Sequence, residues 1–183
     1  MNKISVSITY NKYYNTKSFI CFDGSNYLDY LPESFENTFL LDLINRYEKI
    51  VVFDIKQFLK YYSNRNIILT PEHINKIDSL KLLRHLKDSN NKNLEITDIT
   101  NNEKLDIYSK RINSFKKIYG KDKYLDFIPD YILRNYNIEV VKALFDKEIK
   151  IDNVEYYNDL KIQLYYLGKC EQNGIKIIDN SIE

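Results

Sequence analysis

The sequence predicts an α/β fold with a central mixed sheet and helices packed over it. Patterns typical of strands occupy the first half of the chain, and patterns typical of helices occupy the second half. That order favours a sheet covered by helices over a simple alternation of strands and helices. The 183 residues, 44% hydrophobic and 29% charged, are enough for one domain with its own core. The sequence contains no internal repeat and no long linker, so we expect one folding unit.

The first half begins with a predicted hairpin. Residues 4–10 alternate apolar and polar side chains, which is the periodicity of a strand. Residues 18–22 form the second strand, and a turn over 11–16 joins the two. Pro32 falls at the first turn of a predicted helix that continues to about Glu48.

Two helices that follow are each expected to begin at an aspartate. The apolar run Ile50–Phe53 predicts a buried strand, and Asp54 is placed to cap the helix directly after it. Asp78 is placed in the same way before a helix over 79–87. Between these helices we expect two short extended segments, at 66–69 and 74–77.

Three longer helices are predicted in the second half, over residues 105–119, 130–148 and 154–172. Their apolar side chains recur every three or four residues, as on the buried face of a helix. Gly120 is the expected stop of the first of them, because glycine readily adopts the backbone conformation that ends a helix. Pro129 directly precedes the second.

Charge, cysteines and hydropathy restrict the classes of function. The net charge of +1 is lower than that of most domains that hold DNA tightly by themselves. Cys21 and Cys170 are far apart and lack metal-ligand or redox spacing, so we expect free thiols in a reducing cytoplasm. No apolar run is long enough to span a membrane, and no signal peptide is evident. We therefore expect a cytoplasmic protein without a membrane partner.

Nucleophilic catalysis and phosphate binding by a glycine loop are poorly supported. His73 and His85 are the two histidines, and neither has a Cys or Ser nearby in a recognisable arrangement. The four glycines form neither a dinucleotide-binding motif nor a P-loop. Turns and helix ends are sufficient roles for these glycines.

The most basic run of the chain is a candidate contact with nucleic acid. It contains a tyrosine and four lysines: Lys116, Lys117, Lys121 and Lys123. Clustered cations with an interleaved aromatic side chain can contact phosphates. Asp122 lowers the charge of the run, and an ordinary solvated loop is the alternative interpretation.

Four carboxylates are candidates for a two-metal site, which requires several acids to converge. They are Asp23, Asp54, Asp78 and Glu139. Each also has a local explanation. Asp23 suits a turn, Asp54 and Asp78 suit helix caps, and Glu139 suits an exposed helix face.

Several segments, in the right order, resemble the 3′–5′ exonuclease domain of bacterial family A DNA polymerases (DNA polymerase I). The first is the stretch YEKIVVFDIKQFLKYY and its continuation to Asp88, and two shorter ones are 117–121 and 128–130. The last, LKIQLYYLGKCEQNGIKIID, resembles the connection to the polymerase thumb. Within it, 173–177 is the most specific match. The resemblance covers nearly the whole chain and implies an RNase H-like (DnaQ-type) fold over 1–170, with 171–183 starting that connection.

Active members of this family carry acids in three motifs, and those acids bind two metal ions. The resemblance places other residues at these positions. They are Ser7 and Thr9 at the first motif, Phe58 at the second, and Tyr136 with Val140 at the third. A different register at the third motif would bring Glu139 into the site. Another alternative makes residues 4–10 the second strand, with the first strand outside the sequence.

The resemblance implies a non-catalytic exonuclease-like domain, because apolar side chains cannot ligate magnesium and hydroxyls are poor substitutes for carboxylates. The domain would act as a structural scaffold of a DNA-directed DNA polymerase in replication and repair. Mg²⁺ would belong to the polymerase module, and this domain would be monomeric, hold no metal and touch DNA weakly through the four lysines. Two alternatives remain open: an active exonuclease that uses the rearranged acid set above, and a free-standing interaction domain.

Overall fold

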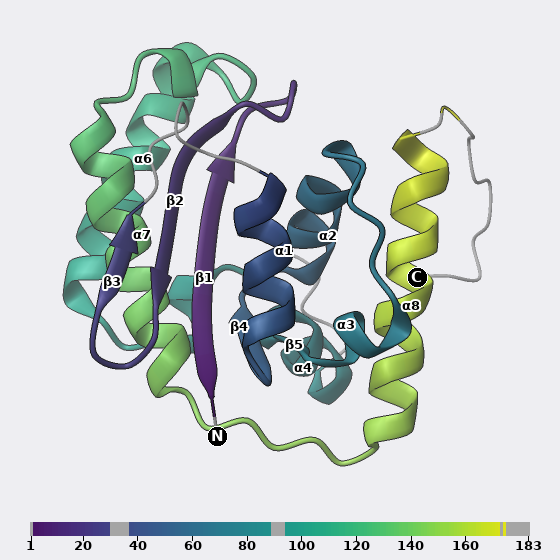
Figure 1. Ribbon diagram of the computed structural model, residues 1–183. Helices are drawn as coiled ribbons and strands as arrows, with labels where there is room; N and C mark the ends of the chain where they lie inside the picture. The colour runs from purple at the N-terminus through teal and green to yellow at the C-terminus, as the bar shows by residue number, and fades with distance from the viewer. Residues whose placement is uncertain (1, 30–36, 89–93, 173, 175–183) are drawn as a thin grey trace.

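The computed structural model describes residues 2–29, 37–88, 94–172 and 174. Five strands form one sheet in the order β3-β2-β1-β4-β5 (Figure 1). The strands are β1 (Lys3–Tyr10), β2 (Thr16–Phe22), β3 (Tyr27–Asp29), β4 (Lys49–Val52) and β5 (Ile77–Ser79). The first three pair antiparallel, whereas β4 runs parallel to β1 and β5 runs parallel to β4. The predicted α/β class with a mixed sheet is therefore confirmed.

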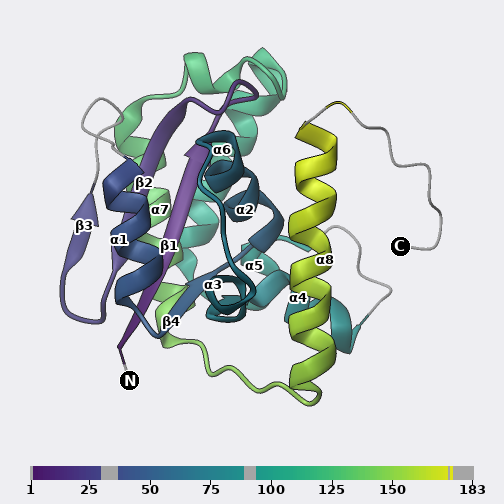
Figure 2. The ribbon, with the colours of Figure 1, turned by 45° about the vertical axis from the view of Figure 1, so that its right-hand side comes forward.

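Helices cover both faces of this sheet (Figure 2). They are α1 (Asn37–Arg46), α2 (Ile55–Asn64), α3 (Pro71–Asn75), α4 (Leu80–Lys87), α5 (Ile96–Ile99), α6 (Glu103–Tyr119), α7 (Asp130–Asp146) and α8 (Val154–Gln172), with a short 3₁₀ turn, η2 (Tyr124–Asp126). On one face, α1 and α2 pack against apolar side chains of β1 and β2. On the other face, α7 lies across β1 and β2, and α6 packs beside α7.

The alternating pattern of β1 separates apolar side chains on one face from polar side chains on the other. Ile4 and Val6 join the core beneath α1 and α2. The hydroxyl of Ser5 instead donates to the main-chain oxygen of Val141 in α7 at 2.6 Å, and Ser5 is fully buried. The hydroxyl of Ser5 therefore faces a helix rather than water, whereas Ser7 and Thr9 are only half-buried.

The outer edge of β5 is covered by α8 rather than by another strand. Lys161 Nζ donates to the main-chain oxygen of Ile77 at 2.7 Å. The main-chain N–H of Ser79 donates to the hydroxyl of Tyr157 at 2.8 Å. Edge strands expose unpaired N–H and C=O groups, and here two side chains of one helix satisfy them.

Two predictions between β4 and α4 are wrong. Asp78 does not cap a helix. It lies within β5, and Ser79 is the N-cap of α4. Residues 74–77 are not one extended segment, because 71–75 form α3, which begins with a capping box between Thr70 and His73. The residues around Pro71 are mostly polar and show no apolar periodicity, so the sequence pattern did not predict this short helix.

Other predictions are confirmed. The hairpin forms, and Asp54 caps α2. Gly120 ends α6 with a φ of 88°, a value that favours glycine. Pro32 lies outside the described residues, as does the segment 173–177 apart from Gly174, so the proposed connection over 171–183 is described only as far as the end of α8.

Candidate functional site

A cleft of about 560 Å³ opens at the carboxyl ends of β1 and β4, between α2 and α7. Residues from β1, β4, α2, α7 and the turn before η2 line it. All five positions that the sequence places at the exonuclease motifs lie in this lining: Ser7, Thr9, Phe58, Tyr136 and Val140. Residues up to 133 positions apart in the chain therefore meet at one place.

A closed network of neutral polar groups occupies the wall formed by β1 and α7. The Ser7 hydroxyl donates to Asn137 Oδ1 at 2.6 Å, and Asn137 Nδ2 donates to Thr9 Oγ1 at 3.0 Å. Asn137 is only 1% exposed, and its amide joins the two hydroxyls of β1. The group carries no charge, and its members satisfy one another's hydrogen bonds.

The sequence did not single out Asn137, although a pattern pointed to it. Asn137 lies four residues after Leu133 and four before Val141, both of which are buried on α7. A polar residue on the apolar face of a helix is buried with it and needs a partner. Ser7 and Thr9 provide that partner.

Apolar side chains of α2 and α7 complete the lining beside this network. Phe58 is 4% exposed, and its ring lies 4.9 Å from the ring of Tyr62, one helical turn further along α2. Val140 is buried with Leu144 beside β4. Neither side chain offers an oxygen to a metal ion, so hydrophobic packing occupies both positions.

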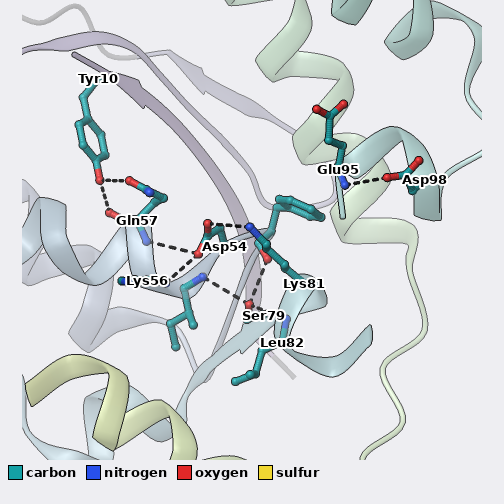
Figure 3. A network of polar contacts seen from close by, with 11 residues as sticks. Tyr10, Asp54, Lys56, Gln57, Ser79, Lys81, Leu82, Glu95 and Asp98 are labelled. Atoms are coloured by element: carbon teal, nitrogen blue, oxygen red, sulfur yellow. Dashed lines mark hydrogen bonds and ion pairs between the residues drawn. The ribbon is translucent and has the colours of Figure 1, made fainter. Parts of the chain in front are cut away.

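Asp54 is a carboxylate of the cleft wall, and its oxygens are already engaged (Figure 3). Its Oδ1 accepts the main-chain N–H groups of Lys56 at 3.0 Å and Gln57 at 3.4 Å. Its Oδ2 lies 3.5 Å from Lys81 Nζ. The residue caps α2 and forms an ion pair with α4, which is a structural role.

The other three acids of the rearranged set lie elsewhere. Asp23 accepts the N–H groups of Ser25 and Asn26 in the turn after β2, and these bonds lower the pKa of its carboxyl. Asp23 follows Phe22, which pairs with Ser5 near the start of β1, whereas Asp54 lies beyond the end of β4.

Asp78 and Glu139 are also engaged outside the cleft. Asp78 Oδ1 accepts a hydrogen bond from the Tyr157 hydroxyl at 3.3 Å, and burial raises the pKa of this carboxyl. Glu139 accepts a hydrogen bond from the Asn102 amide at 3.3 Å. Within the part of the chain that the structure describes, no three His, Cys, Asp or Glu side chains gather as a metal site.

The four predicted lysine contacts divide into two pairs. Lys116 and Lys121 line the cleft, whereas Lys117 and Lys123 are exposed beside it. Lys116 Nζ lies 5.2 Å from the centre of the Tyr124 ring, which also faces the cleft.

Tyr136 connects the cleft to a second hollow of about 280 Å³ between α6 and α7. Burial, and secondarily the charge of Glu95, raises the pKa of Tyr136 to about 12, so its hydroxyl remains protonated at neutral pH. The lining of the cleft thus combines neutral polar side chains with two carboxylates, Asp54 and Asp122, and with Lys116 and Lys121.

Comparisons with known proteins found no match for this chain. No protein-family model matches the chain, and no match was found among the curated proteins or the solved structures. Among the helices formed by the described residues, none is long and apolar enough to cross a membrane.

Proposed function

We propose that the chain is a non-catalytic 3′–5′ exonuclease-like domain that serves as a structural scaffold of a DNA-directed DNA polymerase. The observation that carries this proposal is the convergence of Ser7, Thr9, Phe58, Tyr136 and Val140 in one cleft. An alignment without structural meaning would scatter these positions over the molecule. Their meeting at the end of β1 supports the motif assignment from which the proposal starts.

We further propose that the fold is RNase H-like. Three features support this: a leading antiparallel three-stranded meander, two parallel strands added on the other side of β1, and a cleft where β1 and β4 end. Ligands of open α/β sheets bind at the carboxyl ends of strands, and this cleft has that position.

The chemistry of the lining supports the absence of hydrolysis. Two metal ions need several convergent oxygen ligands, most of them charged. Here Ser7 and Thr9 are paired with Asn137, and Asp54 is paired with Lys81. The alternative of an active exonuclease with a rearranged acid set has no observation in its favour, because Asp54 alone of its four acids lines the cleft.

A nuclease assay tests the non-catalytic part of this proposal. The purified chain is incubated with a 3′-unpaired, 5′-labelled oligonucleotide and Mg²⁺ or Mn²⁺, and products are resolved by length. We expect no shortening from the 3′ end. Metal-dependent shortening that Asp54→Ala abolishes would show that the cleft is an active site.

Capture from cells tests the scaffold role. The chain is immunoprecipitated from the organism that encodes it, and the precipitate is assayed for templated primer extension. We expect polymerase activity in the precipitate, either in the same polypeptide or in a bound one. A precipitate that contains the chain and lacks such activity would refute the scaffold role.

A further inference from the structure

A small hollow of about 80 Å³ opens between α4 and the connection from α7 to α8. It shares no lining residue with the cleft. The connection begins at Lys147, near the start of β1, where Lys3 Nζ donates to the main-chain oxygen of Phe145, whereas the cleft opens where β1 ends (Figure 1). Four aliphatic side chains line the hollow: Leu80, Leu83, Ile99 and Ile149.

Four cations surround this aliphatic floor. Arg84 and Lys87 come from the last turn of α4, and Lys147 and Lys150 come from the connection. Lys147 Nζ donates to the main-chain oxygen of Ile99 at 2.7 Å. This hydrogen bond holds the ammonium group beside the hollow, and its acceptor is neutral, so the positive charge remains.

Negative charge at the hollow does not balance the four cations. Glu148 is the one acid of the lining, and it lies 3.9 Å from Lys150 with the two side chains 80% and 73% exposed, so water screens the pair. The carbonyl ends of α4 and α7 add about half a negative charge each. An excess of about two positive charges remains, and no other ion pair among the described residues involves these cations.

Stabilisation of helix ends explains only part of this arrangement. Cations near the carbonyl end of a helix stabilise it, which is a sufficient role for Arg84, Lys87 and Lys147. Lys150 lies four residues beyond α7 and precedes the N-terminus of α8, where the helix dipole favours acids instead. Ile149 is only half-buried, so part of the aliphatic floor remains in contact with water.

We propose that the basic aliphatic pocket, formed by the four cations and the four aliphatic side chains, binds an acidic peptide segment of a partner protein. One aliphatic side chain of the segment enters the hollow, which has room for one such group. Carboxylates on either side of it contact the cations. Charge complementarity calls for an anion, and the guanidinium of Arg84 suits a carboxylate because it can donate two parallel hydrogen bonds.

The lining favours a peptide over other polyanions. It contains no aromatic ring on which a base could stack, so a nucleic acid would contact the cations with its phosphates and leave the floor unused. A membrane surface calls for projecting apolar side chains, whereas these side chains form the floor of a hollow. The proposal requires neither a polymerase nor a nuclease activity, so it goes beyond the scaffold role.

Nuclear magnetic resonance titration of the isotope-labelled chain tests the proposal. The probe is the acetylated and amidated peptide Glu-Asp-Leu-Asp-Glu, added at low salt. We expect amide shifts at Arg84, Lys87, Ile99 and residues 147–150, and none at Ser7 or Thr9 in the cleft. A small, exposed site predicts a dissociation constant of about 0.1–1 mM, and the affinity should fall as salt is added.

Two altered peptides separate the aliphatic contact from the charge contacts. Replacing the leucine of the probe by serine should weaken binding about tenfold, because the hollow then receives no aliphatic group. Replacing the four acids by glutamine and asparagine keeps the shape of the probe but removes its charge. This neutral peptide should cause no shifts at the pocket.

A pair of protein variants tests the cations. Arg84→Gln combined with Lys150→Gln should weaken binding of the probe about two- to 25-fold, because an exposed ion pair contributes a factor of about 1.4–5. Lys110→Gln combined with Arg111→Gln removes the same two residue types from the exposed face of α6 and should bind like the unaltered chain. Thermal melts monitored by circular dichroism verify that both variants fold.

Four results would overturn the proposal: no shifts with the probe, shifts confined to other residues, equal affinities for the three peptides, or equal affinities of the two protein variants. Oligothymidylate that shifts the same amides at lower concentration than the probe would assign the pocket to nucleic acid instead. The titration uses this chain alone, so its failure leaves the capture of a polymerase unaffected. Failure of that capture likewise leaves peptide binding unaffected.

Discussion

Lys161 provides a direct test of how α8 stabilises the edge of the sheet. The side chain is fully buried, and its Nζ atom donates to the main-chain oxygens of Ile77 at 2.7 Å and Asn75 at 3.2 Å. Burial lowers the pKa of the Lys161 ammonium from 10.5 to about 8, against the opposing effect of Asp78. Lys161→Met keeps the length of the side chain but removes its charge and its hydrogen bonds.

The size of the effect on the unfolding free energy follows from the pKa values of Lys161 in the unfolded and folded states. A fall from 10.5 to about 8 corresponds to about 3 kcal/mol of unfolding free energy while the group is charged. Because the folded state has the lower pKa, the unfolded chain binds more protons between these values. Stability therefore rises with pH across this window, by about 2 kcal/mol between about pH 7 and about pH 9.5.

The variant lacks this rise. At neutral pH, Lys161→Met gains stability because no charge is buried. It also loses stability because two carbonyl groups lack a donor, at about 1–3 kcal/mol each. The two effects nearly cancel there, so one measurement at neutral pH is uninformative. The informative quantity is the difference in unfolding free energy between the chain and Lys161→Met, which should grow by about 2 kcal/mol between about pH 7 and about pH 9.5.

Urea unfolding at a series of pH values measures this difference. Asp78, Lys49 and Tyr157 are the other titratable groups around Lys161, and all three are retained in the variant. Lys142→Met on α7 is the control for removal of an exposed lysine. A difference between the chain and Lys161→Met that stays constant with pH would refute the reasoning, because it would mean that Lys161 titrates alike in the folded and unfolded states.

Three further predictions concern the cleft and the sheet edge. Asn137→Val should lower the unfolding free energy by about 1–3 kcal/mol, because the hydroxyls of Ser7 and Thr9 lose their partner; urea unfolding measures this, and an unchanged midpoint would contradict the network. Tyr157→Phe should cost a similar amount, because the buried N–H of Ser79 loses its acceptor, and hydrogen exchange at Ser79 should quicken; protection equal to that of the unaltered chain would argue against the role of α8. Introducing carboxylates with Ser7→Asp, Thr9→Glu and Val140→Asp should destabilise the metal-free chain but allow Mn²⁺ to raise its melting temperature, whereas Mn²⁺ should leave the unaltered chain unchanged. A variant that folds without responding to Mn²⁺ would contradict the motif assignment.

The parts of the fold that depend on local pattern could be predicted from the sequence. β1 alternates apolar and polar residues, and apolar residues recur every three or four positions in α6, α7 and α8. These elements are long enough for the periodicity to be clear. β5 could not be predicted, because it has three residues and its central one is Asp78. Its strand character depends on pairing with β4 and on the cover provided by α8, and neither is local information.

The candidate site could be predicted only in part. Ser7, Thr9, Phe58, Tyr136 and Val140 came from the resemblance, since no spacing in the sequence connects a strand at the start of the chain with a helix near its end. The structure supplies what the resemblance lacked, which is the partner of the two hydroxyls. The role of Asn137 can be recognised only once α7 is known to pack over β1, because its partners lie on that strand.

The neutral trio of Ser7, Thr9 and Asn137 suits its place between β1 and α7 for a physical reason. Carboxylates on the buried face of β1 would need metal ions or cations beside them, because an unpaired buried charge costs several kcal/mol. Simple apolar replacements at Ser7 and Thr9 would leave the buried Asn137 amide without partners. Two hydroxyls and one amide satisfy each other without any ion.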